Sequence, residues 1–379
     1  MVSQKICLFF SAESTGSSIY DEIEWMINNY VDIINLSWSR VRDTEKGEYC
    51  GEYTSEALYL DYISRTCATT IVKAVGNYSA SNPYDNIGRT HGFEFAPPVG
   101  YNMLVVGSCN NDGELLESSC YVEATDCVDG QGDICHTSIN IPPLEVPHVI
   151  AFGDYGIIPS LSGNDYTGTS FAAPYVTGGI ALLMKKKSEL MITPFMNSAL
   201  VMATAIFLED YNNSSAMAMG LHEQVGVGEM DIFRLLSITE NNYTYTIYRD
   251  DIYYNTVCQK TFYAEKNQIV QIATCNMVNV DDSNISFAPN TYDTDFGIVD
   301  GFNPTEIQQA IKATDYGLYL CDSNGNTLYF CDTEYNTEYL RVVIPKTGNY
   351  TIKIRQMSDS GEDGPITRED YIGLAYYLS

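Results

Sequence analysis

Residues 168–178 read Gly-Thr-Ser-Phe-Ala-Ala-Pro-Tyr-Val-Thr-Gly and are the most informative stretch of the chain. Small residues follow the serine and open a predicted helix that extends to about Lys187. A serine at a helix start has an exposed hydroxyl and lies beside the positive end of the helix dipole. Pro174 suits the first helical turn, where its missing N–H costs nothing. Ser170 is therefore a candidate nucleophile; the alternative, an ordinary N-cap serine, does not account for the whole string.

Length and composition limit the classes of protein to which the chain can belong. The chain has 379 residues, of which 45% are hydrophobic and 18% charged, which excludes global disorder and favours two domains. The net charge of -29 argues against nucleic-acid binding and favours cationic partners. No apolar run approaches the roughly 20 residues of a transmembrane helix. The short apolar patch at residues 6–10 predicts a buried strand rather than a signal peptide.

The sequence has two regions that differ in residue pattern. Residues 1–237 alternate apolar runs with helical periodicity, which predicts a parallel sheet covered by helices. Residues 238–379 carry Tyr- and Thr-rich runs between Asn, Asp and Gly turns, which predicts an all-β sandwich. The predicted helices cover residues 19–30 and 56–66; the predicted strands cover residues 31–36, 70–75, 103–106, 243–248, 269–274, 318–321 and 350–354.

The string around Ser170 resembles the nucleophile motif of the subtilisin-like serine proteases, the subtilases of peptidase family S8. Six further segments resemble family segments in the family's order: residues 31–39, 72–77, 101–107, 147–153, 199–205 and 226–231. The resemblance implies an α/β fold for residues 1–237, a three-layer subtilisin-like domain with a parallel sheet that is incomplete at its N-terminus.

The resemblance also implies roles for individual residues. Ser170 would be the acylating nucleophile, and Asn77 would donate its side-chain amide to the oxyanion. Two walls of the primary specificity pocket would be formed by Ser37, Trp38 and Ser39 and by Ala74, Val75 and Gly76. The implied substrate is a peptide or protein, no cofactor is needed for catalysis, and the implied location is extracellular or on the cell surface.

One part of the family pattern is missing. The family's aspartate and histidine motifs precede the oxyanion asparagine, and neither occurs before Asn77. The four histidines, His91, His136, His148 and His222, all lie in other contexts. The chain thus looks like a subtilase that begins after its histidine helix, with little activity unless a missing N-terminal segment or a partner chain supplies the base. The alternative is a non-catalytic subtilase-fold protein that binds peptides or partners. A third hypothesis, adhesion or carbohydrate binding through the C-terminal part, leaves the motifs at Asn77 and Ser170 unexplained.

The C-terminal part carries a second resemblance. Residues 310–355 are similar to the pre-peptidase C-terminal β-sandwich modules that follow the catalytic domain in many secreted bacterial proteases. Acid-rich loops at residues 281–282 and 293–295 are candidates for structural calcium, with solvated acidic turns as the alternative. Eleven cysteines leave both disulfides and buried free thiols open.

Overall fold

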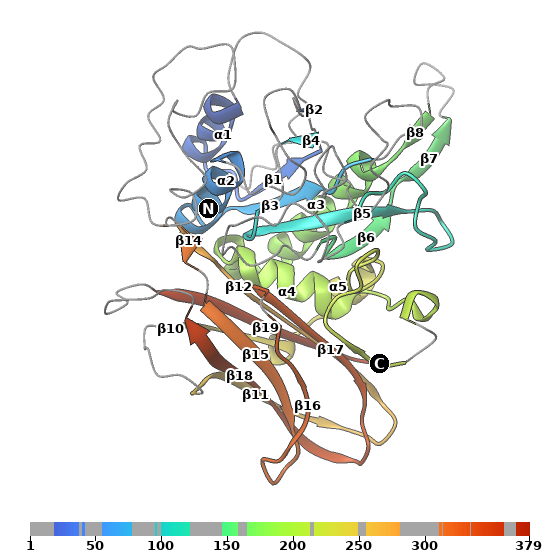
Figure 1. Cartoon of the computed structure of the whole chain (residues 1–379), viewed down its shortest axis with the longest axis vertical. Helices are drawn as coiled ribbons and strands as arrows, with labels where there is room; N and C mark the ends of the chain where they lie inside the picture. The colour runs from blue at the N-terminus through green and yellow to red at the C-terminus, as the bar shows by residue number, and fades with distance from the viewer. Residues whose placement is uncertain are drawn as a thin grey trace, which may run out of the picture.

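The computed structural model of the chain has an α/β part and two antiparallel β-sheets stacked below it (Figure 1). It describes residues 19–37, 40–41, 55–77, 95–96, 100–121, 146–157, 165–212, 216–248, 255–280, 311–312, 314–333, 335–359 and 369–379. The predicted fold class, a parallel-sheet α/β domain with an all-β sandwich, is confirmed.

A parallel sheet with the strand order β1-β3-β5-β6 forms the centre of the α/β part. Its strands are buried on both faces, which explains why they read as unbroken apolar runs in the sequence. The strands of this part are β1 (Ile33–Leu36), β2 (Arg40–Val41), β3 (Thr70–Ala74), β4 (Phe95–Ala96), β5 (Met103–Cys109), β6 (Val149–Phe152), β7 (Asp154–Ile157) and β8 (Asp165–Thr167).

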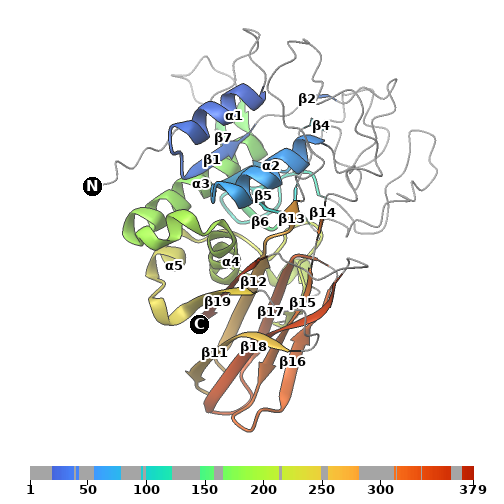
Figure 2. The same cartoon turned by 90° about the vertical axis from the view of Figure 1, so that its left-hand side faces the viewer.

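Helices cover both faces of this sheet and complete three layers (Figure 2). On one face α1 (Ile19–Asn28) and α2 (Ser55–Thr66) pack against alternate strand residues such as Ile34 and Ile71. On the other face α3 (Thr169–Lys186) and α4 (Pro194–Thr204) pack against the remaining set, including Val72. Strand pleating sends successive side chains to opposite faces, so both helix layers draw on the same strands.

The C-terminal part contains two facing antiparallel sheets, one with the order β10-β19-β12-β17-β9 and the other β11-β18-β15-β16. Alternate residues of both sheets form one buried apolar cluster between them. The strands are β9 (Ala218–Met219), β10 (Tyr243–Tyr248), β11 (Thr256–Ala264), β12 (Ile269–Asn276), β13 (Asn279–Val280), β14 (Ile311–Lys312), β15 (Thr314–Cys321), β16 (Thr327–Cys331), β17 (Thr337–Val343), β18 (Gly348–Asp359) and β19 (Asp370–Leu378).

Helix α4 joins the two parts, because all eleven of its residues are buried. It contacts β3 of the parallel sheet in the α/β part, and β12 and β19 in the C-terminal sheet. At Gly373 of β19 the approach is so close that an added Cβ would lie 2.9 Å from Sδ of Met196 and 3.1 Å from the carbonyl oxygen of Phe195. The C-terminal sheet therefore continues the core of the α/β part.

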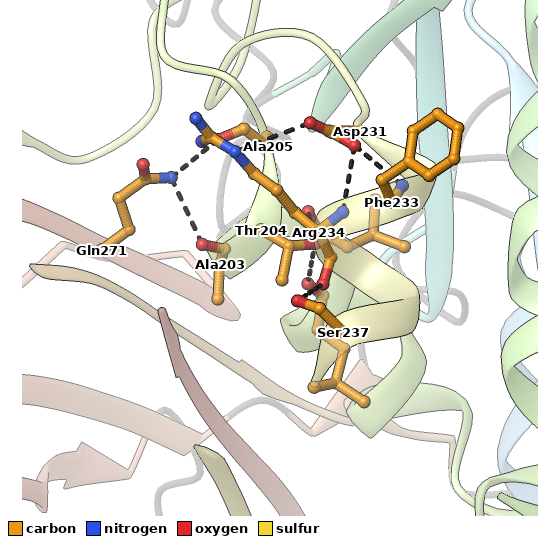
Figure 3. Close-up of polar contacts among 10 residues, drawn as sticks. Ala203, Thr204, Ala205, Asp231, Phe233, Arg234, Ser237 and Gln271 are labelled. Atoms are coloured by element: carbon orange, nitrogen blue, oxygen red, sulfur yellow. Dashed lines mark hydrogen bonds and ion pairs between the residues drawn. The ribbon is translucent and has the colours of Figure 1, made fainter. Parts of the chain in front are cut away.

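The end of α4 depends on the C-terminal sheet for its hydrogen bonds (Figure 3). Nε2 of the buried Gln271 of β12 donates to the carbonyl oxygens of Ala203, at 3.2 Å, and Ala205, at 2.8 Å. The Arg234 guanidinium, from α5 (Ile232–Ser237), also donates to the Ala205 carbonyl. Carbonyls at a helix end lack intrahelical donors, so these side chains satisfy groups that burial would otherwise leave unpaired.

Most of the predicted elements appear with boundaries that differ by a few residues. Helix α1 stops at Asn28 because Tyr30 adopts a φ of 57°, a left-handed conformation that a helix cannot continue through. One interpretation was wrong: Pro174 is the sixth residue of α3 rather than part of its first turn. Because proline has no N–H, the carbonyl of Ser170 loses its usual helical donor there.

Several predictions fall outside the described residues: the strand at residues 6–10 and the acid-rich loops at 281–282 and 293–295. The division of the chain after residue 237 stays a prediction; β9, from before that point, extends the C-terminal sheet. Seven cysteines are described, all as free thiols: Cys67, Cys109, Cys120, Cys258, Cys275, Cys321 and Cys331. No helix in the described ranges has the length and apolar character needed to cross a bilayer.

The packing of β19 on α4 can be tested with one methyl group. We expect Gly373→Ala to lower the free energy of unfolding by roughly 1–3 kcal/mol, because the new Cβ overlaps Met196 and the α4 backbone. Gly348→Ala, in β18, is the control, since nothing lies within 4 Å of its Cβ position. Urea unfolding of both variants gives the comparison; equal stabilities would contradict the close contact.

Candidate active site

The loop from β8 into α3 places Ser170 at the second residue of the helix, where its side chain is half-buried. Gly168 precedes the helix with a φ of 138°, a conformation that favours glycine. Its N–H donates to the carbonyl of Gly153, at 2.9 Å, which fixes the loop beside the end of β6. A Cβ on Gly168 would lie 2.8 Å from Oδ1 of Asn77, so only glycine allows these two segments to approach.

Asn77 lies just past the end of β3 and is oriented by Thr169, the first residue of α3. Its Oδ1 accepts hydrogen bonds from the backbone N–H of Thr169, at 2.8 Å, and from the Thr169 hydroxyl, at 3.1 Å. A backbone N–H can only donate, so the accepting atom must be the amide oxygen. The Nδ2 group therefore lies on the side of the carboxamide that faces away from Thr169.

The end of β1 completes the arrangement around Ser170. The Ser170 hydroxyl donates to the main-chain carbonyl of Ser37, at 2.8 Å. The buried Asn35 of β1 donates from Nδ2 to Oγ of Ser37, at 2.8 Å, and accepts from the Thr177 hydroxyl of α3, at 3.3 Å. Three elements, β1, β3 and α3, thus meet at Ser170.

The residues expected to form the pocket walls lie at the ends of the same strands. Ser37 is half-buried, and Ala74, Val75 and Gly76 are buried. The Gly76 N–H donates to the Thr169 hydroxyl, at 3.3 Å, which ties this segment to α3 as well. Trp38 and Ser39 lie outside the described residues, so the pocket itself stays a prediction.

The two described histidines have partners other than Ser170. His148 is buried, its Nδ1 accepts from the Val105 N–H at 2.9 Å, and burial lowers its pKa to about 4. Nδ1 of His222 accepts from the Gln224 N–H at 3.2 Å, and burial lowers its pKa too. In the described part of the chain, then, no histidine hydrogen bonds to the Ser170 hydroxyl. His91 and His136 lie outside that part.

The sequence pointed to Ser170, Asn77 and the strand ends, which the structure brings together, but it did not point to the residues that orient them. Thr169 lay inside the quoted string and was treated only as part of it. Asn35 and Thr177 are far apart in the sequence and come together only because β1 runs beside α3. A polar residue in each of two buried, apolar segments was the available signal. The described residues contain no group of three or more His, Cys, Asp or Glu side chains suited to a metal.

Comparison with known proteins identifies the family of the chain. The family model described as "Subtilase family" matches residues 3–228, more than half of the chain. This chain belongs to the subtilase family. Two similar relatives are Subtilisin NAT of Bacillus subtilis subsp. natto and Subtilisin of Bacillus pumilus, each 25% identical over 181 residues. Each alignment covers 46% of this subtilase. It covers 37% of Subtilisin NAT and 51% of the Bacillus pumilus protein, so the chain spans about half of their length or less.

Solved structures give a distant likeness to the subtilase chain. The patellamide maturation protease PatA is 20% identical, with a TM-score of 0.39, and the alignment covers 57% of this chain and 66% of that one. MycP1 of the ESX-1 type VII secretion system is 20% identical, with a TM-score of 0.36, and the coverage is 56% and 53%.

The contact between Gly168 and Asn77 can be tested through stability alone. We expect Gly168→Ala to cost roughly 1–3 kcal/mol, because alanine is strained at a φ of 138° and its Cβ meets the Asn77 amide. Gly178→Ala, farther along the same helix, is the matched control; its Cβ meets open space, and alanine should stabilise the helix by roughly 0.5–1 kcal/mol. Chemical denaturation gives the change in the free energy of unfolding for each variant. A Gly168→Ala variant as stable as the parent would refute the close contact with Asn77.

Proposed function

We propose that this subtilase contributes the nucleophile and oxyanion site of a serine endopeptidase of the subtilisin class. Ser170 attacks the peptide carbonyl and forms an acyl-enzyme as the amine leaves. The observation that carries the proposal is the Asn77 amide, whose oxygen is held by two donors of Thr169. Its Nδ2 would then be the group that donates to the oxyanion. An amide fixed before the reaction does not have to reorganise as charge develops.

The start of α3 supports the same chemistry. The first N–H groups of a helix have no intrahelical acceptor, and the helix dipole places partial positive charge there. The Ser170 N–H is therefore proposed as the second donor to the oxyanion, beside Nδ2 of Asn77. Both favour the negative charge of the tetrahedral intermediate over the neutral carbonyl of the substrate, which is what lowers the barrier.

The proton of the Ser170 hydroxyl needs an acceptor that the described residues do not place beside it. In the resting arrangement that proton is donated to the carbonyl of Ser37, which is too weak a base to take it. We propose that a histidine and its orienting carboxylate come from outside the described residues, from another segment or from a partner chain. Without them Ser170 is a poor nucleophile at neutral pH, and only residual catalysis is expected.

The substrate is proposed to be an extended peptide. Its main chain would pair with the ends of β1 and β3, and one side chain would enter a pocket between residues 37–39 and 74–76. Such acyl transfer needs no catalytic cofactor; structural calcium in the loops at 281–282 and 293–295 is a separate proposal. An extracellular or cell-surface location, and a pre-peptidase C-terminal-like role for the sandwich beyond residue 237, are proposed from the same family relationship.

A second function is favoured by one observation, the hydrogen bond between the Ser170 hydroxyl and the Ser37 carbonyl. A serine whose proton rests on a main-chain oxygen is not activated. A subtilase fold in that state would bind peptides or partner proteins along the same strand ends without cleaving them. This alternative predicts peptide binding with no covalent adduct on Ser170.

A fluorophosphonate probe separates the two functions, because it reacts only with an activated serine. We expect labelling at Ser170 in protein purified from its native source, none in Ser170→Ala, and full labelling in Ser237→Ala, an exposed serine of α5. Asn77→Ala should slow labelling by about 10²–10³-fold, the loss known for an asparagine donor in subtilisin itself. Peptide mapping of the adduct by mass spectrometry gives the readout, and no adduct in the folded native protein would contradict the endopeptidase.

A further inference from the structure

Four aromatic rings gather next to Ser170 on the side away from β1. We call them the aromatic patch: Phe152 at the end of β6, Tyr155 in β7, Tyr166 in β8 and Phe171 in α3. Their ring centroids are 4.9 Å apart for Phe152 and Tyr155, 6.1 Å for Tyr155 and Phe171, and 5.7 Å for Tyr166 and Phe171. Edge-to-face and tilted contacts at these distances make one continuous apolar surface.

This patch is only partly covered by the rest of the chain. Tyr155 is 44% exposed, and the other three rings are half-buried. Three ring contacts hold the side chains together, and Tyr155 is the most exposed of the four. Contiguous exposed aromatic surface is uncommon on folded proteins and often marks a binding site. Because Phe171 directly follows Ser170, a ligand on the patch would reach the nucleophile.

Contacts on two sides of Ser170 indicate which half of a bound peptide would lie over the patch. On one side the Ser170 hydroxyl contacts the Ser37 carbonyl at the end of β1. On the other side Gly168 is bound to Gly153, where β6 passes into β7. In the strand order β1-β3-β5-β6 the patch lies at the β6 edge, opposite β1. A peptide whose acyl half pairs with the ends of β1 and β3 would therefore leave Ser170 on the side of the patch.

We propose that the aromatic patch binds an aromatic or large apolar side chain in the leaving-amine half of the peptide, and that Tyr155 is a specificity-determining residue. This inference rests on the proposed binding of a peptide across Ser170. Strand β7 also carries Asp154, in a chain with a net charge of -29. An acidic side chain at this position is therefore disfavoured, whereas an uncharged aromatic ring gains contact with several faces and edges.

Binding can be measured whether or not the protein cleaves peptides. The experiment uses the full chain with Ser170→Ala and fluorescein-labelled ten-residue Ala/Gly peptides, in which a single Phe, Ala or Asp is moved along the sequence. Fluorescence anisotropy gives the Kd of each peptide. We expect one Phe position at which affinity exceeds that of the Ala peptide by roughly 5- to 20-fold, with the Asp peptide weakest.

Tyr155→Ala should remove most of that preference, measured as the ratio of the Kd values of the Ala and Phe peptides. Tyr263→Ala is the matched control, since Tyr263 is an exposed tyrosine of β11, in the sheet farther from α4. Phe and Ala peptides that bind equally, or not at all, would overturn the proposal, as would a Phe preference that survives Tyr155→Ala. A Tyr155-dependent preference together with no fluorophosphonate labelling of Ser170 would refute the endopeptidase and leave the binding site standing.

Discussion

The hydrogen bonds from Thr169 to the carboxamide oxygen of Asn77 are the contact on which the site depends. They join the end of β3 to the start of α3, two segments about ninety residues apart in the chain. The same contact requires glycine at position 168, because any Cβ there would occupy the space of the amide. The position and orientation of the Asn77 side chain and the backbone conformation at Gly168 thus follow from one short-range constraint.

The contact is only as rigid as the elements that it joins. Helix α3 packs against the strands of the parallel sheet and contacts α5, which also contacts α4. Helix α4 is in turn buried against β12 and β19 and has its final carbonyls bound by Gln271. The C-terminal sheets therefore stabilise the layer that carries the nucleophile, and their role in this chain includes support for the site.

The sequence alone was sufficient for the parts of the fold that are encoded locally. Ser170 and Asn77 sit in short strings with characteristic neighbours, and the buried strands read as apolar runs because helices cover both faces. Long-range polar contacts were not predictable, since Asn35, Thr177 and Gln271 acquire their partners only through tertiary packing. The sixth-residue position of Pro174 was also missed, because helix boundaries depend on the cap, here a glycine without a side-chain hydrogen bond.

The central claim is that Ser170 and the Asn77 amide converge on one reacting carbonyl. A crystal structure of the phosphonylated protein from its native source tests this most directly. The account predicts a covalent bond from Oγ of Ser170 to phosphorus and a phosphoryl oxygen at roughly 2.7–3.1 Å from Nδ2 of Asn77. An adduct whose oxygen points into solvent, or an Asn77 amide still without contact to it, would contradict the account.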